Sequence, residues 1–436
     1  MKARIPLEPL RGFRDLLPPD SKLLSRLIEK FRKLVELHGY SYVIPPTLER
    51  FQLFALKSGE EIRRTMYVFR DKAGREVALR PEATASIARI YLKHLRGRPK
   101  PLRLYYVVNC FRYEEPQFAR YREFWQAGVE LLGLPGIEGD IEVAKILLDY
   151  YDELHMLNNI TLKVNNIAVY RKLFSKYHVP EEEQDRILHY MDKKEYEKAA
   201  GILQLYGDLY ARIKCLWDAR APKDATACSL GEEAEKHLEE LETFTDVISS
   251  YKPGANIDAD LTFARGLAYY DGIVFEVKVR DFPVSIAGGG RYSGLISLYG
   301  GEDVPGTGFA VGVDRTAAAL QHLGLDRELL RTGEARVAII TLSTSRRVLR
   351  HAYNIQGVLV KHEIPATITY GSRKTLKKLG KLVEVGYTHA IIVGEREAEE
   401  GTITLRDLRT RQQTKYKDIE GALIALSPTE TKPTQY

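Results

Sequence analysis

The stretch that decides the fold is FRYEEPQFARYREFWQAGVE, residues 111–130, which directly follows LRLYYVVNC at residues 102–110. The earlier run is rich in aromatic and branched apolar residues and is typical of a buried strand. The stretch after it nevertheless holds three arginines and four glutamates among its aromatic residues. This combination needs an explanation, because charged groups are seldom buried without partners.

Strand alternation divides the stretch into two faces, because successive side chains of a strand point to opposite sides. One face is expected to pack in the core and carries Trp125, Ala127, Val129 and Leu131. The other face carries Arg122, Phe124, Gln126, Gly128 and Glu130. On the preceding strand Arg112 and Glu114 are expected to face together, with residues 115–121 as the connecting loop.

Two explanations fit the charged face. Cross-strand ion pairs on a solvated sheet surface are the ordinary one. A nucleotide site is the other, because an aromatic ring such as Phe124 can stack on a planar base and an arginine can hold a phosphate with two parallel hydrogen bonds. Other segments of the chain favour the nucleotide site.

Three such segments carry polar residues where elements begin or turn. LRPEATA places Glu82 and Thr84 at the start of a predicted helix, where a helix cap is the alternative role. GFAVGVDRTAAAL places Arg315 where a strand enters a helix, and the free N–H groups there favour phosphate. RGLAYYDG places Arg265 close to a pair of tyrosines at a predicted hairpin. The chain has neither a Walker sequence nor a GxGxxG sequence, so strands and arginines are expected to bind the nucleotide.

Composition bounds the class of protein. A chain of 436 residues is expected to form two to three domains. The net charge of +6 gives a mild preference for acidic partners. The sequence has no apolar signal core and no run of about 18 apolar residues, so we expect a cytoplasmic protein that does not associate with a membrane. Cys110, Cys215 and Cys228 match neither a disulfide framework nor a metal site, and we expect all three to be reduced.

Sequence texture predicts the order of the domains. Residues 20–38 have the spacing of an amphipathic helix. Residues 170–255 are charged and helical in pattern, and strand-like sequence resumes after them, which indicates a helical insertion within one sheet. After a linker at 327–334, alternating strands and helices at 335–427 predict a small α/β domain with a largely parallel sheet. The tail at 428–436 is expected to be disordered.

Together these segments resemble the class II aminoacyl-tRNA synthetases, and within them the histidyl-tRNA synthetase family, over nearly the whole chain. The stretch at 111–130 resembles motif 2, GYSYVIPP with Pro46 resembles the dimer-forming motif 1, and TGFAVGVDRTAAAL resembles motif 3. Those motifs define the class. RGLAYYDGIVFE and GGGRYSGL resemble the two histidine-specific signatures, which narrow the resemblance to one family.

The resemblance implies the fold and the reaction. Residues 1–330 would form an α+β catalytic domain with an antiparallel six-stranded sheet, and the C-terminal domain would bind the anticodon. The protein would be a homodimer through motif 1. It would join L-histidine to histidine tRNA by way of a histidyl-adenylate, consuming ATP and releasing diphosphate. Mg²⁺ would enter with the ATP phosphates, because no motif supplies metal ligands.

The resemblance also implies roles in ATP binding and catalysis. Arg112 would hold the α-phosphate and the reacting carboxylate, and Phe124 would stack on adenine. Arg120 and Arg315 would hold the outer phosphates. Arg265 would take the place of a catalytic metal near the α-phosphate. A cationic site suits in-line attack on phosphorus, which needs positioning and charge neutralisation more than proton transfer.

The histidine substrate would occupy the remaining part of the site. Its ammonium group is expected at Glu82, Gln126 and Glu130, and its imidazole at Tyr270 and Glu130. The full set implied for histidine is Glu82, Thr84, Gln126, Glu130, Arg265, Tyr269, Tyr270 and Tyr292. A site that hydrogen-bonds both ring nitrogens rejects isosteres that lack them, because its own polar groups are then left unpaired.

Three positions depart from the common family pattern. Many members carry a basic residue at the position of Glu115 and glycine at that of Ala119, so the sequence leaves open how this loop recognises the tRNA acceptor end. Ala268 stands where aspartate is common.

Two alternative functions are possible for a chain with this resemblance: a non-aminoacylating regulatory subunit of histidine biosynthesis, and a class II synthetase for another amino acid. The retained arginines argue against the first, and the two signatures argue against the second.

In the C-terminal domain, one predicted helix face is basic. Its lysines are Lys374, Lys377, Lys378 and Lys381, opposite Leu376, Leu379 and Val383. A solvated helix face and a stripe of RNA phosphate contacts both fit this pattern.

Overall fold

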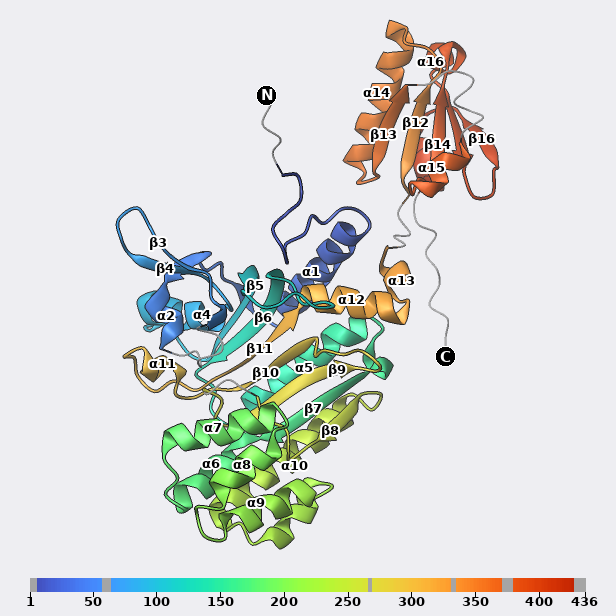
Figure 1. Cartoon of the computed structure of the whole chain (residues 1–436). Coiled ribbons are helices and arrows are strands. Elements are labelled where there is room, and N and C mark those ends of the chain that lie inside the picture. Colours follow the sequence, from blue (N-terminus) through green and yellow to red (C-terminus); the bar gives the residue numbers. More distant parts are fainter. Residues whose placement is uncertain (1–5, 57–63, 266–268, 331–334, 371–378, 427–436) are drawn as a thin grey trace. The chain divides into compact units, whose positions relative to one another are not determined.

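The chain forms two compact units, Met1–Leu330 and Arg331–Tyr436. The computed structural model describes residues 6–56, 64–265, 269–330, 335–370 and 379–426. Figure 1 shows the elements of each unit. The predicted tail at 428–436, Ala268 and three lysines of the predicted basic face (Lys374, Lys377, Lys378) lie outside the described residues.

A mixed eight-stranded sheet is the centre of the first unit within its described residues. In spatial order its strands are β1 (Ser41–Tyr42), β5 (Leu102–Phe111), β6 (Glu123–Leu132), β11 (Gly306–Gly312), β10 (Ala287–Arg291), β9 (Ile273–Val279), β7 (Ile160–Asn166) and β8 (Asn256–Ala259). The strands from β5 to β7 pair antiparallel throughout. β1 and β8 pair parallel to their neighbours at the two edges.

The prediction of an antiparallel sheet is confirmed, but the strand number of six is wrong for the sheet as a whole. The two additional strands are parallel, and parallel pairing requires a long connection between the partners. The helical insertion supplies that connection between β7 and β8. The insertion therefore begins and ends at neighbouring strands of one sheet.

One face of this sheet is covered by three helices, α1 (Asp20–Leu37), α5 (Ile137–Glu153) and α12 (Val313–Leu323). The predicted helix at 20–38 is confirmed as α1, which buries Leu23, Leu27, Phe31 and Val35. The Phe31 ring lies edge-on to Tyr150 of α5 at 5.4 Å and to Phe309 of β11 at 6.2 Å. The core thus lies between these helices and the sheet.

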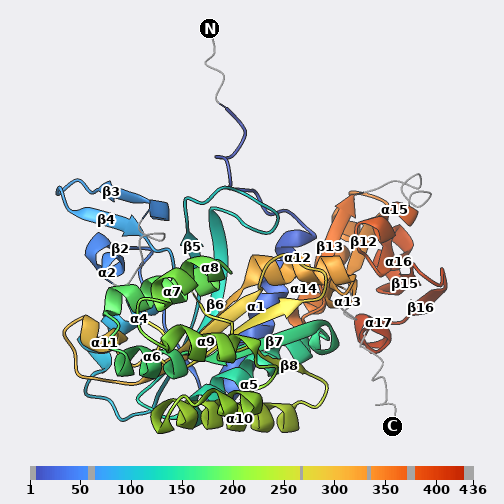
Figure 2. The same cartoon turned by 60° about the horizontal axis from the view of Figure 1, so that its bottom comes forward.

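The regular elements among the described residues of the insertion are all helices, as predicted. Its elements are α6 (Ile167–Lys176), α7 (Glu181–Asp192), α8 (Tyr196–Leu203), α9 (Leu209–Asp218), the 3₁₀ helix η3 (Pro222–Cys228) and α10 (Glu232–Tyr251). Helix α10 packs against α5, α6, β7 and β8. Figures 1 and 2 show these helices gathered into one bundle beside the sheet.

Smaller elements complete the first unit. A separate three-stranded sheet has the order β2 (Leu48–Arg50), β4 (Glu76–Leu79) and β3 (Val68–Arg70). The short helices are α2 (Phe51–Ala55), α4 (Thr84–Ile90) with its continuation η1 (Tyr91–Leu95), η2 (Leu157–Asn159), α11 (Leu295–Leu298) and α13 (Asp326–Leu330).

The second unit has a five-stranded sheet within its described residues. Its order is β13 (Ala366–Tyr370), β12 (Val337–Thr341), β14 (His389–Val393), β15 (Ile403–Asp407) and β16 (Gln413–Tyr416). The helices are α14 (Arg346–Lys361), α15 (Gly380–Glu384), α16 (Glu395–Glu400) and α17 (Ile419–Leu426). The first three strands are parallel, but β15 and β16 are antiparallel, so the expected largely parallel sheet is mixed.

The apolar side of the predicted basic helix is only partly buried. Leu379 is buried, as expected, whereas Val383 is 42% exposed. Lys381 belongs to α15.

Two of the three cysteines are paired, which corrects the prediction that all are reduced. Cys215 at the end of α9 and Cys228 at the end of η3 form a disulfide, with their Cα atoms 5.6 Å apart. Three widely spaced cysteines gave no indication of this pairing, because it depends on how two segments of the insertion pack. Cys110 is free and buried.

None of the helices in the described part of the chain combines the length and the apolar character needed to cross a membrane.

Candidate active site

One cavity of the first unit brings together all the residues to which the resemblance gave a role in binding ATP or histidine or in catalysis. Phe124, Gln126 and Glu130 of β6 line it, whereas Ala127 and Val129 on the opposite face of the strand are buried in the core. The other predicted residues that line it are Glu82, Thr84, Arg112, Arg120, Arg265, Tyr269, Tyr270, Tyr292 and Arg315. The two-faced strand expected from alternation is therefore present.

Four arginines gather in one part of the cavity, which we call the arginine half: Arg112, Arg120, Arg265 and Arg315. Backbone carbonyl groups hold three of them. Arg112 Nε donates to Pro81 O at 3.0 Å, Arg265 Nη1 to Phe275 O at 3.2 Å, and Arg315 Nη1 to Ser285 O at 3.1 Å.

The arginine half is crowded with positive charge. The pKa of Arg315 is lowered to about 10, first by burial and then by repulsion from Arg120, Arg112 and Arg265. Glu114 opposes this shift, and it pairs with Arg120 at 3.5 Å and with Arg112 at 3.8 Å. An arginine with a lowered pKa is held at an electrostatic cost that a bound anion would offset.

A glycine makes room for Arg265. A Cβ atom on Gly288 of β10 would overlap the Arg265 guanidinium, so a side chain at this position would displace the arginine. The second glycine-rich signature, GGGRYSGL, thus has a steric function in this structure. Arg265 Nε is buried and has no hydrogen-bond partner.

Tyrosines and a buried carboxylate form the other part of the cavity, the tyrosine half: Glu130, Tyr269, Tyr270 and Tyr292. The Tyr292 hydroxyl donates a hydrogen bond to Glu130, which is 2% exposed. Burial raises the pKa of Tyr292 well above its ordinary value, and Glu130 adds to the rise. The centroid of the Tyr269 ring lies 4.7 Å from that of Tyr270 and 6.0 Å from that of Tyr292.

Glu82, Thr84 and Gln126 lie beside the tyrosine half. The Glu82 carboxylate accepts from Thr84 N at 2.7 Å and from Ala85 N at 3.1 Å, at the start of α4. The helix cap weighed as an alternative role is therefore present, and Glu82 also lines the cavity. Gln126 Oε1 accepts a hydrogen bond from the Cys110 thiol at 3.2 Å.

Arg122 does not line the cavity, which corrects its predicted place beside Phe124. β6 begins at Glu123, so the alternation of the strand does not extend to residue 122. The Arg122 guanidinium instead lies 3.8 Å from the centroid of the Tyr113 ring and donates to Arg11 O at 3.2 Å.

The motif 2 loop is held by the N-terminal segment. Glu115 forms an exposed ion pair with Arg11, and the Arg14 guanidinium lies 3.6 Å from the centroid of the Tyr121 ring. Ala119 has a φ of 54°, in the left-handed region that favours glycine. Ala119 thus adopts a backbone conformation that glycine adopts more readily.

Several lining residues were missed by sequence reasoning. Glu114 was expected to face the same side as Arg112 but was given no function. Ser285 and Gly288 act through a carbonyl oxygen and through the absence of a side chain, neither of which leaves a pattern in the sequence. Among the described residues, no group of three His, Cys, Asp or Glu side chains is placed to hold a metal ion.

An antiparallel sheet with a cavity of four arginines beside buried tyrosines is the arrangement expected for a class II aminoacyl-tRNA synthetase. The family model for histidyl-tRNA synthetase matches residues 12–316, and a model for an anticodon binding domain matches residues 336–423. The chain belongs to the histidyl-tRNA synthetase family.

Individual relatives agree with this assignment. A histidine–tRNA ligase from Sulfolobus acidocaldarius is 41% identical over 96% of this chain and 98% of its own length. One from Metallosphaera sedula is also 41% identical, with the same coverage of both chains. The crystal structure of apo S. aureus histidyl-tRNA synthetase superimposes with a TM-score of 0.71 at 26% identity, covering 96% of this chain and 99% of that one.

Proposed function

We propose that the protein is a histidine–tRNA ligase that forms histidyl-adenylate from L-histidine and ATP and then transfers the histidyl group to histidine tRNA. In the first step a carboxylate oxygen of histidine attacks the α-phosphorus of ATP, and the bond to the diphosphate leaving group breaks. In the second step a hydroxyl of the terminal adenosine attacks the carbonyl carbon, and AMP leaves.

The observation that carries this proposal is the arginine half. Burial, and after it repulsion from three neighbouring arginines, lowers the pKa of Arg315 to about 10. A polyphosphate would neutralise this repulsion, so ATP binding and arginine positioning support each other. Arg112 and Arg265 are assigned to the α-phosphate, Arg120 and Arg315 to the outer phosphates, and Phe124 to adenine. The Arg112 guanidinium lies over the Phe124 ring, 5.4 Å from its centroid, so the adenine and phosphate positions would be adjacent.

The tyrosine half is assigned to histidine. Glu130 is buried and accepts from Tyr292, and both Glu130 and the neighbouring Tyr270 line the cavity where a polar ring would lie. Glu82 and Gln126 are assigned to the ammonium group, with Thr84 and Tyr269 beside them. A buried carboxylate discriminates strongly against a substrate that leaves it unpaired.

Mg²⁺ would reach the site with ATP and neutralise phosphate charge, and no protein side chain is assigned to it. The residues of the arginine half fit this arrangement, because they are cations that complement phosphate oxygens and do not bind metals.

The chain organisation follows from the same assignment. We assign residues 1–330 to the catalytic domain, with 170–255 as its insertion, and residues 335–427 to anticodon binding.

We also propose that the protein forms a homodimer through motif 1 and acts in the cytoplasm. Near Pro46, the side chains of Ile44 and Leu48 are 70% and 46% exposed, which suits a protein partner. A single mass near twice 49.6 kDa in light scattering is the expected result.

Histidine-dependent exchange between ATP and labelled diphosphate tests the reaction. We expect exchange with histidine and none with proline or threonine. A folded preparation that exchanges all three amino acids equally, or none, would refute the assignment. The alternative of a regulatory subunit, which would show no exchange, is not favoured, because relatives at 41% identity are named histidine–tRNA ligases.

Truncation after residue 330 tests the division of labour. We expect the truncated protein to keep part of its exchange activity and to lose most of its tRNA charging, because the second unit is assigned to the anticodon. Equal loss of both activities would contradict separate roles for the two units.

A further inference from the structure

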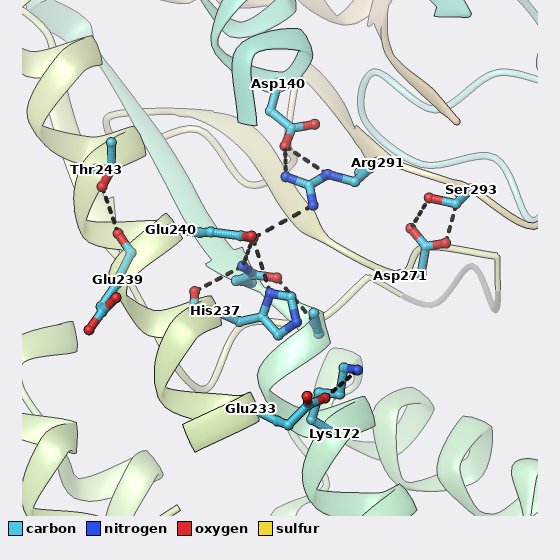
Figure 3. A network of polar contacts seen from close by, with 12 residues as sticks. Asp140, Lys172, Glu233, His237, Glu239, Glu240, Thr243, Asp271, Arg291 and Ser293 are labelled. Carbon is cyan, nitrogen blue, oxygen red and sulfur yellow. Dashed lines mark hydrogen bonds and ion pairs between the residues drawn. The ribbon is translucent and has the colours of Figure 1, made fainter. Parts of the chain in front are cut away.

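Arg291, at the end of β10, forms ion pairs with two carboxylates outside the cavity, and its side chain is largely buried. Its Nε lies 2.9 Å from Asp140 Oδ2 of α5, and its Nη2 bonds the same oxygen. Its Nη1 lies 3.6 Å from Glu240 Oε2 of α10. Asp140 is fully buried, and burial raises its pKa to about 6 although Arg291 opposes the rise. Figure 3 shows the guanidinium between the two carboxylates.

The backbone around Arg291 is joined to the tyrosine half. Tyr292 is the next residue and bonds Glu130. Arg291 O accepts from Asp271 N at 3.1 Å, and the Asp271 carboxylate accepts from Ser293 N at 2.7 Å. Residues 291–293 and the segment that follows Tyr270 are therefore fastened to each other behind the cavity.

Gly272 has no side chain, which leaves room for the Arg291 guanidinium to lie against the segment that follows Tyr270. A Cβ atom on Gly272 would approach Arg291 Cδ to 2.7 Å and Nε to 2.9 Å, distances that a packed side chain does not tolerate. A displacement of the Arg291 side chain would therefore press on the segment that carries Tyr269 and Tyr270.

Glu240 continues the network into the insertion. Its Oε2 accepts from Asn166 Nδ2 at 3.3 Å and contacts His237 Nδ1 at 3.0 Å. Asn166 Nδ2 also donates to His237 O at 2.9 Å, and Asn166 Oδ1 caps α6 through Ala168 N. The one guanidinium thus joins α5 beneath the sheet, α10 of the insertion and the strand end beside Tyr292.

We propose that Arg291 is a positioning residue for the histidine pocket, and that its ion pair with Glu240 makes the geometry of that pocket depend on the docking of the helical insertion. Neither side chain lines the cavity, so both act through Tyr292 and through the segment at Tyr269 and Tyr270. ATP is held on the other side by arginines that this network does not contact. The inference rests on the proposed function and adds to it a coupling between insertion and substrate site.

Glu240→Gln tests the coupling. The glutamine amide keeps the shape of the Glu240 side chain, and its oxygen can accept from Asn166. It lacks the negative charge that attracts the Arg291 guanidinium. We expect the KM for histidine in diphosphate exchange to rise about three- to tenfold, and the KM for ATP to stay within about twofold. Glu239→Gln is the matched control, because Glu239 is the exposed neighbour whose side chain points away from Arg291 in Figure 3. It should change neither constant.

A double-mutant cycle with Arg291→Lys separates positioning from stability. Lysine keeps the charge but cannot span both carboxylates, so the double variant should lose less than the two single losses combined. An unchanged histidine KM in Glu240→Gln, or an equal rise in both KM values, overturns the inference even if Arg291→Lys fails to fold. An inactive wild-type protein would instead refute the proposed function, and calorimetric histidine binding by the same variants would then decide the inference.

Discussion

The arginine half and the tyrosine half of the cavity share one sheet but differ in how their polar groups are satisfied. In the arginine half, four cations converge and the pKa of Arg315 is lowered. In the tyrosine half, Tyr292 donates to the buried Glu130, and the rings pack against one another. The first half needs an anion to balance its charge, whereas the second already has the shape of a pocket. This difference shows that the two substrates would meet sites prepared in different ways.

The largest expected effect lies in the arginine half. Arg265→Ala removes a preorganised charge, so kcat for diphosphate exchange should fall by about two orders of magnitude, corresponding to about 3 kcal/mol. Exchange kinetics with saturating ATP and histidine measure it. Arg265→Lys, which keeps the charge without the planar fork, should recover only part of the loss. Near-normal turnover of Arg265→Ala would remove its catalytic role and the distinction between the halves.

In the tyrosine half, Tyr292→Phe removes the hydroxyl that donates to Glu130. The histidine KM should rise about tenfold, because the buried carboxylate loses a partner, while the ATP KM changes little. Tyr299→Phe is the control: its hydroxyl donates to Leu53 O at 2.7 Å outside the cavity, so it should affect stability alone. A parallel rise in the ATP KM would show that the halves are not independent.

The two halves should also respond differently to alkaline pH. Arg315 loses its positive charge as the pH rises through its pKa of about 10, so kcat/KM for ATP should fall about twofold between pH 8 and pH 10. The pKa of Tyr292 is raised well above its ordinary value, so Tyr292 stays protonated in this window and adds no loss of its own. Any fall in kcat/KM for histidine over the same range should therefore follow the titration of the substrate's own α-ammonium group. An unchanged kcat/KM for ATP between pH 8 and pH 10 would contradict this assignment of charge to Arg315.

The smallest effect concerns the loop that carries Arg120. Ala119 has a positive φ, which glycine adopts without steric cost, but glycine also gains entropy in the unfolded chain. The two effects oppose each other, so Ala119→Gly should stabilise the protein by less than about 1 kcal/mol. Thermal unfolding measures this difference. A clear loss of stability would mean that contacts of the Ala119 methyl group outweigh the backbone strain.

Much of the site could be predicted because strand alternation is a property of the backbone. It placed Phe124, Gln126 and Glu130 in the cavity and Val129 in the core. Strand alternation failed for Arg122, because this residue precedes the first residue of β6 and belongs with the connecting loop. The interpretation of the other site residues came from family resemblance, because segments far apart in the sequence meet only in the folded sheet.

The remaining errors have a common physical cause. β1 has two residues and β8 has four, and their parallel pairing at the edges of the sheet is set by packing between distant segments. The disulfide depends on where α9 and η3 meet, which the spacing of two cysteines does not determine. Interactions of backbone carbonyls, such as that of Ser285 with Arg315, have no side-chain signal. Tertiary packing decides each of these features.

The disulfide also has a practical consequence for labelling. Cys215 and Cys228 are bonded to each other, and the remaining thiol, Cys110, is buried with its pKa raised to about 12 by burial. The thiolate is the nucleophile that attacks an alkylating reagent, so the folded, oxidised protein should react with such reagents very slowly. A single cysteine introduced on an exposed helix would therefore carry a fluorophore selectively, without removal of any native cysteine. Distance measurements between the insertion and the catalytic sheet become accessible in this way.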